Sequence, residues 1–300
     1  MSVMKTLAII GSTASGKSDL ALTLAQRYNG IILSIDSLSI YKEIDIASAK
    51  PTKNELSCVK HFGIDCLKPD ENASVITFIE EYRRIQHQAV AENKNIIIVG
   101  GSSFYLKSMI EGLSQIPIYS PSTLQKAKEM IVDLAECHRV LRDADPITME
   151  KIASSDAYRI EKMLLIYLET QTAPSDWFRA HPPSPIITEC PVLHLDIERS
   201  LLRERIALRT QKMVTMGLID EVAELERQYG RMPNSMKAIG IVEALDYLDG
   251  KITKTEMTEL ITTHTAQLAK RQQTFNTRQF TLTANGSANV LETIAETILK

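Results

Sequence analysis

Cysteine is scarce in this 300-residue chain, and its placement excludes two common uses of the thiol. No two cysteines form a C-x-x-C pair, and no group of cysteines and histidines has the spacing of a zinc finger. The chain therefore lacks the pattern of a disulfide framework or a structural zinc site, and we expect reduced thiols, as in a cytosolic protein. The four cysteines are Cys58, Cys66, Cys137 and Cys190.

Long apolar runs and an excess of positive charge are also missing. No stretch approaches the roughly 18 apolar residues that a membrane-spanning helix needs, and the apolar residues 7–10 are too few for the core of a signal peptide. We therefore expect a cytoplasmic protein without a membrane segment. The formal net charge of -3 provides no overall positive field for a nucleic acid, so any RNA site must be a local basic patch.

Four short and almost continuously apolar runs indicate the core of the fold. They cover residues 7–10, 31–35, 96–99 and 192–195, and each is followed by a glycine or an aspartate. Continuous rather than alternating apolar runs are typical of strands buried on both faces of a parallel sheet. Helical patterns separate the runs, so we predict an α/β fold with right-handed crossovers and a ligand crevice at the carboxyl ends of the strands.

The segment between the third and fourth runs predicts a separate helical domain, because it contains no strand-like run. A helical block between two strands is a frequent lid in phosphate-handling enzymes. We therefore predict that residues 116–185 form an inserted helical domain and that residues 1–115 and 186–300 form the core. Within the insertion the pattern favours helices over residues 124–141, 146–153 and 158–170.

The chain after residue 196 is helical in pattern, and we predict no strand there. Glycines and a proline predict interruptions at Gly217, residues 230–233 and Gly250. Between Glu259 and Glu292 there is no acidic residue, while Lys270, Arg271 and Arg278 are present. This stretch is the local basic patch that an RNA-binding function would need.

A phosphate-binding loop motif, G-x-x-x-x-G-K-S, lies between the first apolar run and the helical pattern that follows. This strand-turn-helix context favours a binding site over the alternative, a glycine turn that happens to contain a lysine. Glycines let successive backbone N–H groups point into one concavity, and the helix N-terminus adds positive potential. Lys17 would contact the phosphates, and the Ser18 hydroxyl would bind Mg²⁺. The predicted loop consists of Gly11, Ser12, Thr13, Ala14, Ser15, Gly16, Lys17 and Ser18.

The loop predicts a phosphate-containing ligand without identifying that ligand as ATP. A hydrolase usually has a second strand ending in an acid that organises Mg²⁺, but the third apolar run ends at Gly100 without an acid. The second run, in contrast, ends at Asp36. This carboxylate could be a metal-organising acid, a general base or a helix N-cap. Its place at the carboxyl edge of the sheet favours a catalytic role.

Several segments closely resemble those of one family, in the same order along the chain. Residues 36–51 are similar to the pattern D-S-x-x-x-Y-x-x-x-D-I-x-T-A-K-P of the tRNA dimethylallyltransferases, and residues 11–18 resemble that family's form of the phosphate-binding loop. The likeness extends from Leu7 to about Arg278, so it does not rest on a single motif. Further similar segments are residues 100–105, 156–160, 238–243 and 269–275.

The resemblance implies a fold and a reaction. The fold is a P-loop NTPase-like parallel sheet flanked by helices, with an inserted helical domain that clamps tRNA. The reaction transfers a dimethylallyl group from dimethylallyl pyrophosphate to N6 of the adenine at tRNA position 37, 3′ to the anticodon, and releases pyrophosphate. Asp36 is then the candidate base, Lys17, Ser18 and Arg209 act on the pyrophosphate side, and Mg²⁺ is the cofactor.

The resemblance also implies which residues contact the RNA. Residues 36–39 would contact a flipped nucleotide, and residues around 159–162 would clamp the anticodon stem. From the residues alone, Arg205 and Arg209 could equally form a solvated basic face, and residues 270–272 a polar helix. The predicted tRNA contacts are Asp36, Ser37, Leu38, Ser39, Ser102, Tyr158, Arg159, Lys162, Lys270, Arg271 and Gln272.

The sequence departs from the family pattern at several places. Ser12 replaces a proline, Ser103 a glycine, Lys162 an arginine and Asn276 an aromatic residue. Because lysine binds phosphate as a point charge and not as a bidentate partner, we predict weaker tRNA binding. None of these departures touches the predicted catalytic residues.

Two other functions stay open from the residues. A small-molecule or nucleotide kinase would share the loop, the parallel sheet and a helical lid, with Arg139 and Arg142 as lid arginines. A non-catalytic RNA-binding module could retain the phosphate pocket, although the intact Lys17, Ser18 and Asp36 argue against it. For the prenyl transfer that the resemblance implies, we expect the chain to act as a monomer.

Overall fold

The computed structural model describes residues 4–300, so residues 1–3, which precede the segment considered for a signal peptide, lie outside the described residues. The chain forms two compact units. The first unit combines the chain up to Ile110 with Ile187–Lys300, and the second unit comprises Glu111–Ile186. The predicted insertion, residues 116–185, falls within the second unit.

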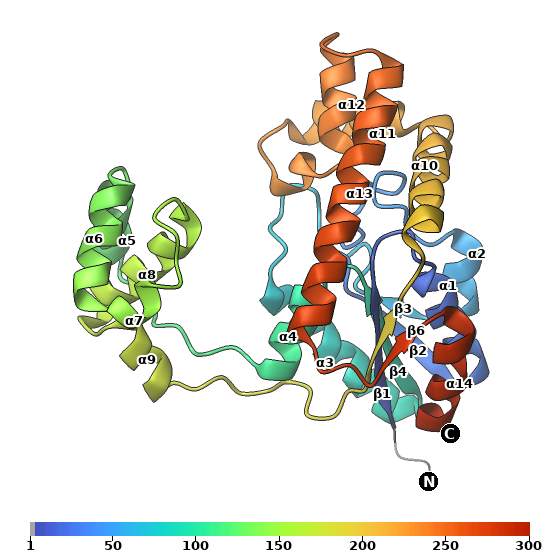
Figure 1. The fold of residues 1–300 in the computed structure, drawn as a ribbon, viewed down its shortest axis with the longest axis horizontal. Helices are drawn as coiled ribbons and strands as arrows, with labels where there is room; N and C mark the ends of the chain where they lie inside the picture. Colours follow the sequence, from blue (N-terminus) through green and yellow to red (C-terminus); the bar gives the residue numbers. More distant parts are fainter. Residues whose placement is uncertain (1–3) are drawn as a thin grey trace. The chain divides into compact units, whose positions relative to one another are not determined.

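The first unit is built on a parallel sheet, which confirms the predicted α/β fold (Figure 1). Within residues 4–300 the sheet has six strands in the order β3-β2-β4-β1-β5-β6, and all neighbours are parallel. The carboxyl ends of all these strands therefore meet at one edge, where α/β proteins bind ligands. The strands are β1 (Thr6–Gly11), β2 (Gly30–Ser34), β3 (His61–Phe62), β4 (Asn95–Gly100), β5 (Val192–Leu195) and β6 (Ala284–Gly286).

The two edge strands, β3 and β6, differ from the sequence-based prediction. β3 has two residues and β6 has three, and each lies at an edge of the sheet. A segment of this length cannot contain an apolar run, and pairing with a longer neighbour makes it a strand. The prediction that the chain after residue 196 contains no strand was therefore wrong at β6.

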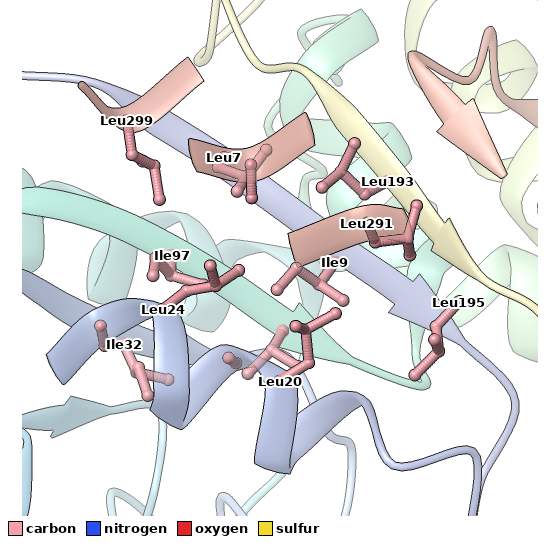
Figure 2. Packing of buried hydrophobic residues seen from close by; sticks show 14 of the residues in the cluster. Leu7, Ile9, Leu20, Leu24, Ile32, Ile97, Leu193, Leu195, Leu291 and Leu299 are labelled. Carbon is pink, nitrogen blue, oxygen red and sulfur yellow. The ribbon is translucent and has the colours of Figure 1, made fainter. Parts of the chain in front are cut away.

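One face of the sheet packs against α1 (Lys17–Arg27) and α14 (Ala288–Leu299). Its side chains come from alternate residues of each strand, because successive side chains of a strand point to opposite faces. Burial of this apolar surface is the main favourable contribution to folding. The side chains labelled in Figure 2 belong to this buried cluster: Leu7, Ile9, Leu20, Leu24, Ile32, Ile97, Leu193, Leu195, Leu291 and Leu299.

The rest of the first unit is helical. In the N-terminal part α3 packs against β2 and β4, and in the C-terminal part α10 packs along α13 (Figure 1). The predicted breaks at Gly217 and Gly250 are confirmed, and both glycines have a positive φ, 101° and 70°, which residues with a Cβ rarely adopt. The helices are α2 (Lys53–Cys58), α3 (Val75–Glu92), α4 (Ser103–Glu111), α10 (Arg199–Thr215), α11 (Leu218–Tyr229), α12 (Ile241–Leu248) and α13 (Lys254–Gln279).

The second unit is helical and has its own apolar core. The predicted helix 124–141 is two helices, α5 (Pro121–Met130) and α6 (Leu134–Ala144), because Asp133 accepts a hydrogen bond from the backbone N–H of Glu136 (3.0 Å) and caps a new helix. The other helices are α7 (Pro146–Met149), α8 (Ala157–Thr170) and α9 (Pro174–Ala180). The core includes Ala127, Cys137, Leu141, Ile160 and Leu164.

Across residues 4–300, no helix combines the length and the apolar character needed to cross a membrane.

Candidate active site

The phosphate-binding loop connects β1 to α1 at the carboxyl edge of the sheet. Its backbone turns sharply at Ala14 and Gly16, whose φ angles are 61° and 95°. Gly16 is the N-cap of α1, so free N–H groups and the positive end of the helix dipole lie at this point. The loop borders a cavity of about 470 Å³. Its cavity-lining residues are Thr13, Ala14, Gly16, Lys17 and Ser18.

The other predicted loop residues, Gly11, Ser12 and Ser15, do not line this cavity but shape the turn. The backbone N–H of Ser15 donates to the Ser12 carbonyl (3.2 Å). A Cβ atom on Gly11 would lie 3.0 Å from both the Leu195 carbonyl oxygen and the Ser15 hydroxyl. Glycine at this position therefore permits β1, β5 and the loop to approach one another closely.

Lys17 is a buried charge in the wall of this cavity. Only 9% of the residue is exposed, and its Nζ donates to the Ser12 carbonyl (3.1 Å). Burial lowers the pKa of Lys17 to about 8; the carboxylate of Asp36 opposes this shift, and the nearby Arg209 adds to it. Lys17 thus supplies a poorly solvated positive charge, which a bound anion would stabilise.

Asp36 follows β2 and lies at the same edge of the sheet. Its Oδ1 accepts hydrogen bonds from the backbone N–H groups of Leu38 (2.9 Å) and Ser39 (3.1 Å). These bonds cap a turn, and the next helix, α2, begins only at Lys53, so the helix N-cap alternative was wrong. Within residues 4–300 no protein donor bonds the second carboxylate oxygen, Oδ2, so one oxygen orients the group while the other stays available.

A neighbouring turn after β4 supports the Asp36 turn. The backbone N–H of Ser102 donates to the Ile35 carbonyl (3.3 Å), and the Ser102 hydroxyl accepts from the Ser37 N–H (3.1 Å). A Cβ on Gly100 would lie 2.6 Å from the Ile35 carbonyl oxygen, so this approach requires glycine. The hydroxyl of Ser102, a predicted tRNA contact, therefore has a partner inside the protein.

Helix α10 reaches the phosphate-binding loop through two arginines. Arg205 Nη1 donates to the Ser15 carbonyl (3.0 Å), and Arg209 Nη1 donates to the Thr13 hydroxyl (3.2 Å). Burial lowers the pKa of Arg209, although Asp36 opposes this effect. Both arginines therefore contact the phosphate-binding loop. Side chains of a solvated basic face would make no such contacts, so that alternative does not describe them.

A second cavity, of about 530 Å³, adjoins the first. Four residues, Thr13, Lys17, Asp36 and Arg209, line both cavities. The loop-bordered cavity is mainly polar, whereas many residues of the second are apolar or aromatic. The predicted contacts Ser37, Leu38, Ser102 and Gln272 line the second cavity, together with Phe104, Tyr105, Ile206, Met213, Ile239, Ile261 and Leu268.

The segment that joins Asp36 to α2 is held by charged side chains that the sequence-based prediction missed. Glu221 of α11 accepts hydrogen bonds from three successive backbone N–H groups, those of Asp45 (2.9 Å), Ile46 (2.7 Å) and Ala47 (2.9 Å). Lys50 Nζ, nearly buried, pairs with the carboxylates of Asp45 (2.7 Å) and Asp65 (2.5 Å). The only available signal was the motif D-I-x-T-A-K-P, which contains Lys50 but not Glu221.

The remaining predicted RNA contacts lie on two separate helices. In the second unit, Tyr158, Arg159 and Lys162 share the start of α8; Tyr158 is 70% exposed, and Lys162 Nζ lies 5.3 Å from the centre of its ring. In the first unit, Lys270 and Arg271 are exposed on α13.

A groove of about 890 Å³ between α10 and α13 extends the basic patch. The described residues that line it include four bases and no acid: Arg199, Arg203, Lys270 and Arg278. The structure brings Arg199 and Arg203 beside α13, and they were not among the predicted sites. In the sequence they precede Arg205 and Arg209 in the same basic stretch, which gives no sign that they lie beside α13.

The family model described as IPP transferase matches residues 39–279. The tRNA dimethylallyltransferase of Sulfurimonas denitrificans is 52% identical over 291 residues, covering 97% of this chain and 98% of that protein. The chain belongs to the IPP transferase family. Another family member, the tRNA dimethylallyltransferase of Wolinella succinogenes, is 47% identical over 299 residues, covering 99% of this chain and all of the relative.

Solved structures of IPP transferases agree with the fold. The tRNA isopentenylpyrophosphate transferase of Bacillus halodurans superposes with a TM-score of 0.72 at 26% identity, covering 99% of this chain and 97% of that chain. A eukaryotic dimethylallyltransferase, described as acting on tRNA, gives a TM-score of 0.80 at 25% identity and covers 90% of this chain and 69% of its own. These likenesses confirm the predicted P-loop NTPase-like core, and family membership does not favour the kinase alternative.

Proposed function

We propose that this IPP transferase transfers a dimethylallyl group from dimethylallyl pyrophosphate to N6 of adenine 37 in tRNA and releases pyrophosphate. One observation supports this reaction above the others. Lys17, Asp36, Arg209 and Thr13 stand where a polar cavity beside the phosphate-binding loop meets a mainly apolar one. A donor diphosphate and an incoming base can therefore reach the same charged groups from two cavities.

The diphosphate of the donor would lie in the loop-bordered cavity. Backbone N–H groups at the start of α1 and the charges of Lys17 and Arg209 would stabilise the pyrophosphate as it leaves. Donors fixed where negative charge develops are among the largest contributions to catalysis. A bound anion would stabilise the charged form of Lys17 most, because it compensates for the hydration that burial removes from the ammonium group.

The residues of the loop fit a Mg²⁺ ion that is bound mainly through the diphosphate. The Ser18 residue is exposed, lines the cavity, and within residues 4–300 no protein group bonds its hydroxyl. The described residues contain no group of three or more acidic, histidine or cysteine side chains that could hold a metal alone. Mg²⁺ commonly uses few protein ligands together with substrate phosphates and water. When bound by Ser18 and the diphosphate, it would neutralise charge on the leaving group.

Asp36 would act as the general base for the adenine amine. The exocyclic amine is a poor nucleophile, so a carboxylate must accept its proton as the new C–N bond forms. Two backbone N–H groups hold Oδ1, which leaves Oδ2 to take the proton. The dimethylallyl carbon is attacked by N6, the bond to the pyrophosphate oxygen breaks, and the proton leaves N6 for Asp36.

The adenine would enter the second cavity after leaving the stack of the anticodon loop. Bases that undergo chemistry are taken out of the stack, and aromatic side chains such as Phe104 and Tyr105 suit an unstacked base. Ser37 and Leu38 would contact this base, and Lys270 and Arg271 the adjoining backbone. Residues 158–162 of the second unit would contact the anticodon stem.

We also propose that the chain works as a monomer in the cytoplasm. The charged groups that the proposed reaction needs, Lys17, Asp36 and Arg209, all belong to one chain, and the proposed tRNA substrate is cytoplasmic.

The test is prenyl transfer itself. The protein is incubated with labelled dimethylallyl pyrophosphate, Mg²⁺ and unmodified tRNA, and label is expected in the RNA. A tRNA with guanine at position 37 should remain unlabelled. Asp36→Asn should lose on the order of 100-fold or more in turnover while it still binds tRNA, since general base catalysis contributes factors of this size.

Two results would count against the proposal. Absence of label from the RNA with the wild-type protein would refute the reaction, and loss of tRNA binding in Asp36→Asn would make this residue structural. ATP-dependent phosphorylation of a small molecule without any prenyl donor would revive the kinase alternative.

A further inference from the structure

Gln272 of α13 uses both ends of its side-chain amide within the protein. Its Oε1 accepts a hydrogen bond from the backbone N–H of Thr13 (2.8 Å), and its Nε2 donates to the carbonyl of Gly101 (3.1 Å). Thr13 belongs to the phosphate-binding loop, and Gly101 to the turn after β4. One side chain thus joins the two loops that border the second cavity.

Gly101 is the residue that makes room for this amide. A Cβ atom at position 101 would lie 2.5 Å from Gln272 Nε2, a distance that non-bonded atoms do not tolerate. The second glycine of the Gly100-Gly101 pair therefore has a specific function, distinct from that of Gly100, which admits the Ile35 carbonyl.

The contacts continue from Gly101 to Asp36. Ser102, the next residue, donates through its N–H to the Ile35 carbonyl and accepts the Ser37 N–H on its hydroxyl. The Ser37 turn is the one that Asp36 caps. Hydrogen bonds, together with the backbone links between adjacent residues, therefore connect Thr13, through Gln272, to the turn that Asp36 caps.

We propose that Gln272 is a positioning residue that holds the diphosphate pocket at a fixed distance from the base Asp36. The proposal rests on the proposed function for the roles of these two sites. It replaces the expectation that Gln272 contacts tRNA, because both polar ends of its side chain already have partners in the protein. RNA contact on this helix is left to the exposed side chains of Lys270 and Arg271.

The physical reason lies in the geometry of group transfer. The carbon attacked by N6 is attached to the diphosphate, whereas the proton acceptor is attached to the β2 turn. A displacement of about 1 Å between two such groups can reduce a rate about 100-fold. Helix α13 holds Thr13 by its backbone N–H, and α10 holds the same residue by its hydroxyl through Arg209.

The test compares Gln272→Met with the wild-type protein. Methionine keeps the length and volume of glutamine but can neither accept from Thr13 nor donate to Gly101. Turnover at saturating substrates should fall about 10- to 100-fold, and inorganic pyrophosphate with Mg²⁺, titrated by calorimetry, should bind less tightly. The dissociation constant for tRNA should stay within about twofold of wild type, since no base-edge or phosphate contact is lost.

Gln86→Met is the matched control, because Gln86 is an exposed glutamine of α3 that lines neither cavity nor the basic groove. It should leave turnover, pyrophosphate binding and tRNA binding unchanged. If Gln272→Met instead raises the dissociation constant for tRNA while turnover at saturating tRNA and pyrophosphate affinity stay at wild-type values, Gln272 is an RNA contact and the proposal is wrong. An unchanged Gln272→Met overturns it as well.

A second variant tests the same contact from the other side and covers the case in which Gln272→Met fails to fold. Gly101→Ala puts a methyl group against the amide and should reproduce the loss of turnover. In a Gly101→Ala, Gln272→Ala double variant the clash is gone, so the two effects should be clearly less than additive, whereas independent sites add. Additive effects would overturn the proposal.

Failure of the proposed function can be distinguished from failure of this proposal, because the binding of pyrophosphate and of tRNA is measured without catalysis. A wild-type protein that binds both ligands but transfers no prenyl group would refute the proposed function and not the Gln272 contact.

Discussion

Lys17 shows at the scale of one residue how function opposes stability. Its ammonium group is buried beside the cationic Arg209, and the carboxylate of Asp36 compensates in part for the loss of water. Its pKa of about 8 in the folded protein lies below the ordinary value of 10.5. The unfolded chain therefore binds this proton more tightly than the folded chain does, so the group destabilises the fold at neutral pH and less so as the pH rises from about 8 to 10.5.

We predict that Lys17→Met raises the free energy of unfolding at pH 7, by up to about 3 kcal/mol, while it abolishes prenyl transfer. The gain should shrink as the pH rises through 8 towards 10.5, because the wild-type lysine then loses its charge. Denaturant unfolding at pH 7 and at pH 10 measures both effects. Lys53→Met, at an exposed lysine of α2, is the control and should change little. A Lys17→Met variant that is less stable than wild type at pH 7 would contradict the prediction.

The roles of single residues could be predicted only where a local motif carries them. Lys17 and Asp36 were predicted because each follows a strand within a recognisable motif. The role of Gln272 could not be predicted in this way, because its partner Thr13 lies 259 positions away and the contact forms only when α13 packs beside β1. The same holds for Glu221, which lies 176 positions from Asp45.

At the scale of elements, α11 serves as a scaffold for an irregular segment that lines both cavities. Residues 45–51 have no regular secondary structure, and Ala49 has a φ of 49°, which is uncommon for alanine. A segment of this kind depends on outside partners for its conformation. Glu221 provides them by accepting three backbone N–H groups with its two oxygens.

We predict that Glu221→Gln disorders this segment and impairs turnover. Glutamine has one acceptor oxygen in place of two, and its amide N–H₂ would face a backbone N–H, so at least one donor loses its partner. The cost should be about 1.5–3 kcal/mol in the free energy of unfolding, the usual range for hydrogen bonds to charged groups. Chemical denaturation measures this value, and prenyl transfer assays the activity.

Glu224→Gln on the same helix is the matched control for this prediction. Glu224 is exposed and pairs with Arg227 at the surface, an arrangement that contributes little. Its replacement should change stability by less than about 0.5 kcal/mol. An equal loss of stability in the two variants would mean that α11 itself is sensitive to the replacement of glutamate by glutamine. The role given to Glu221 would then be wrong.

Which elements were predictable follows from how they are stabilised. The four central strands are buried on both faces and could be recognised as apolar runs, and the helix breaks at Gly217 and Gly250 follow from local backbone preference. The edge strands β3 and β6 depend on pairing with a neighbour and have no local signal. Helix α9 was missed because only seven residues form it, too few for a helical pattern to be recognised, and its first residue is a proline.

At the scale of the whole molecule, charge is distributed so that a net negative protein can still bind RNA. The chain has 37 acidic and 34 basic side chains of lysine and arginine. The groove between α10 and α13 nevertheless contains Arg199, Arg203, Lys270 and Arg278 without an acid among its described lining residues. Within residues 4–300 none of these four side chains has an ion-pair partner, so each is free to neutralise a phosphate.

This distribution predicts a moderate dependence of tRNA binding on salt. Each phosphate neutralised on RNA contributes about 0.7 to 0.9 to the slope of log K against log salt concentration, because bound counterions are released. If Arg199 and Arg203 both contact backbone phosphates, replacing them with glutamine should reduce the slope by about 1.5. Filter binding of tRNA at several salt concentrations measures the slope.

The control for this prediction replaces Arg227 and Arg231 with glutamine. Both arginines are paired with acids on the surface, so the slope should stay unchanged. An unchanged slope in the Arg199 and Arg203 variant would restrict the RNA surface to the exposed side of α13, because phosphate contacts made only by Lys270 and Arg271 do not depend on α10.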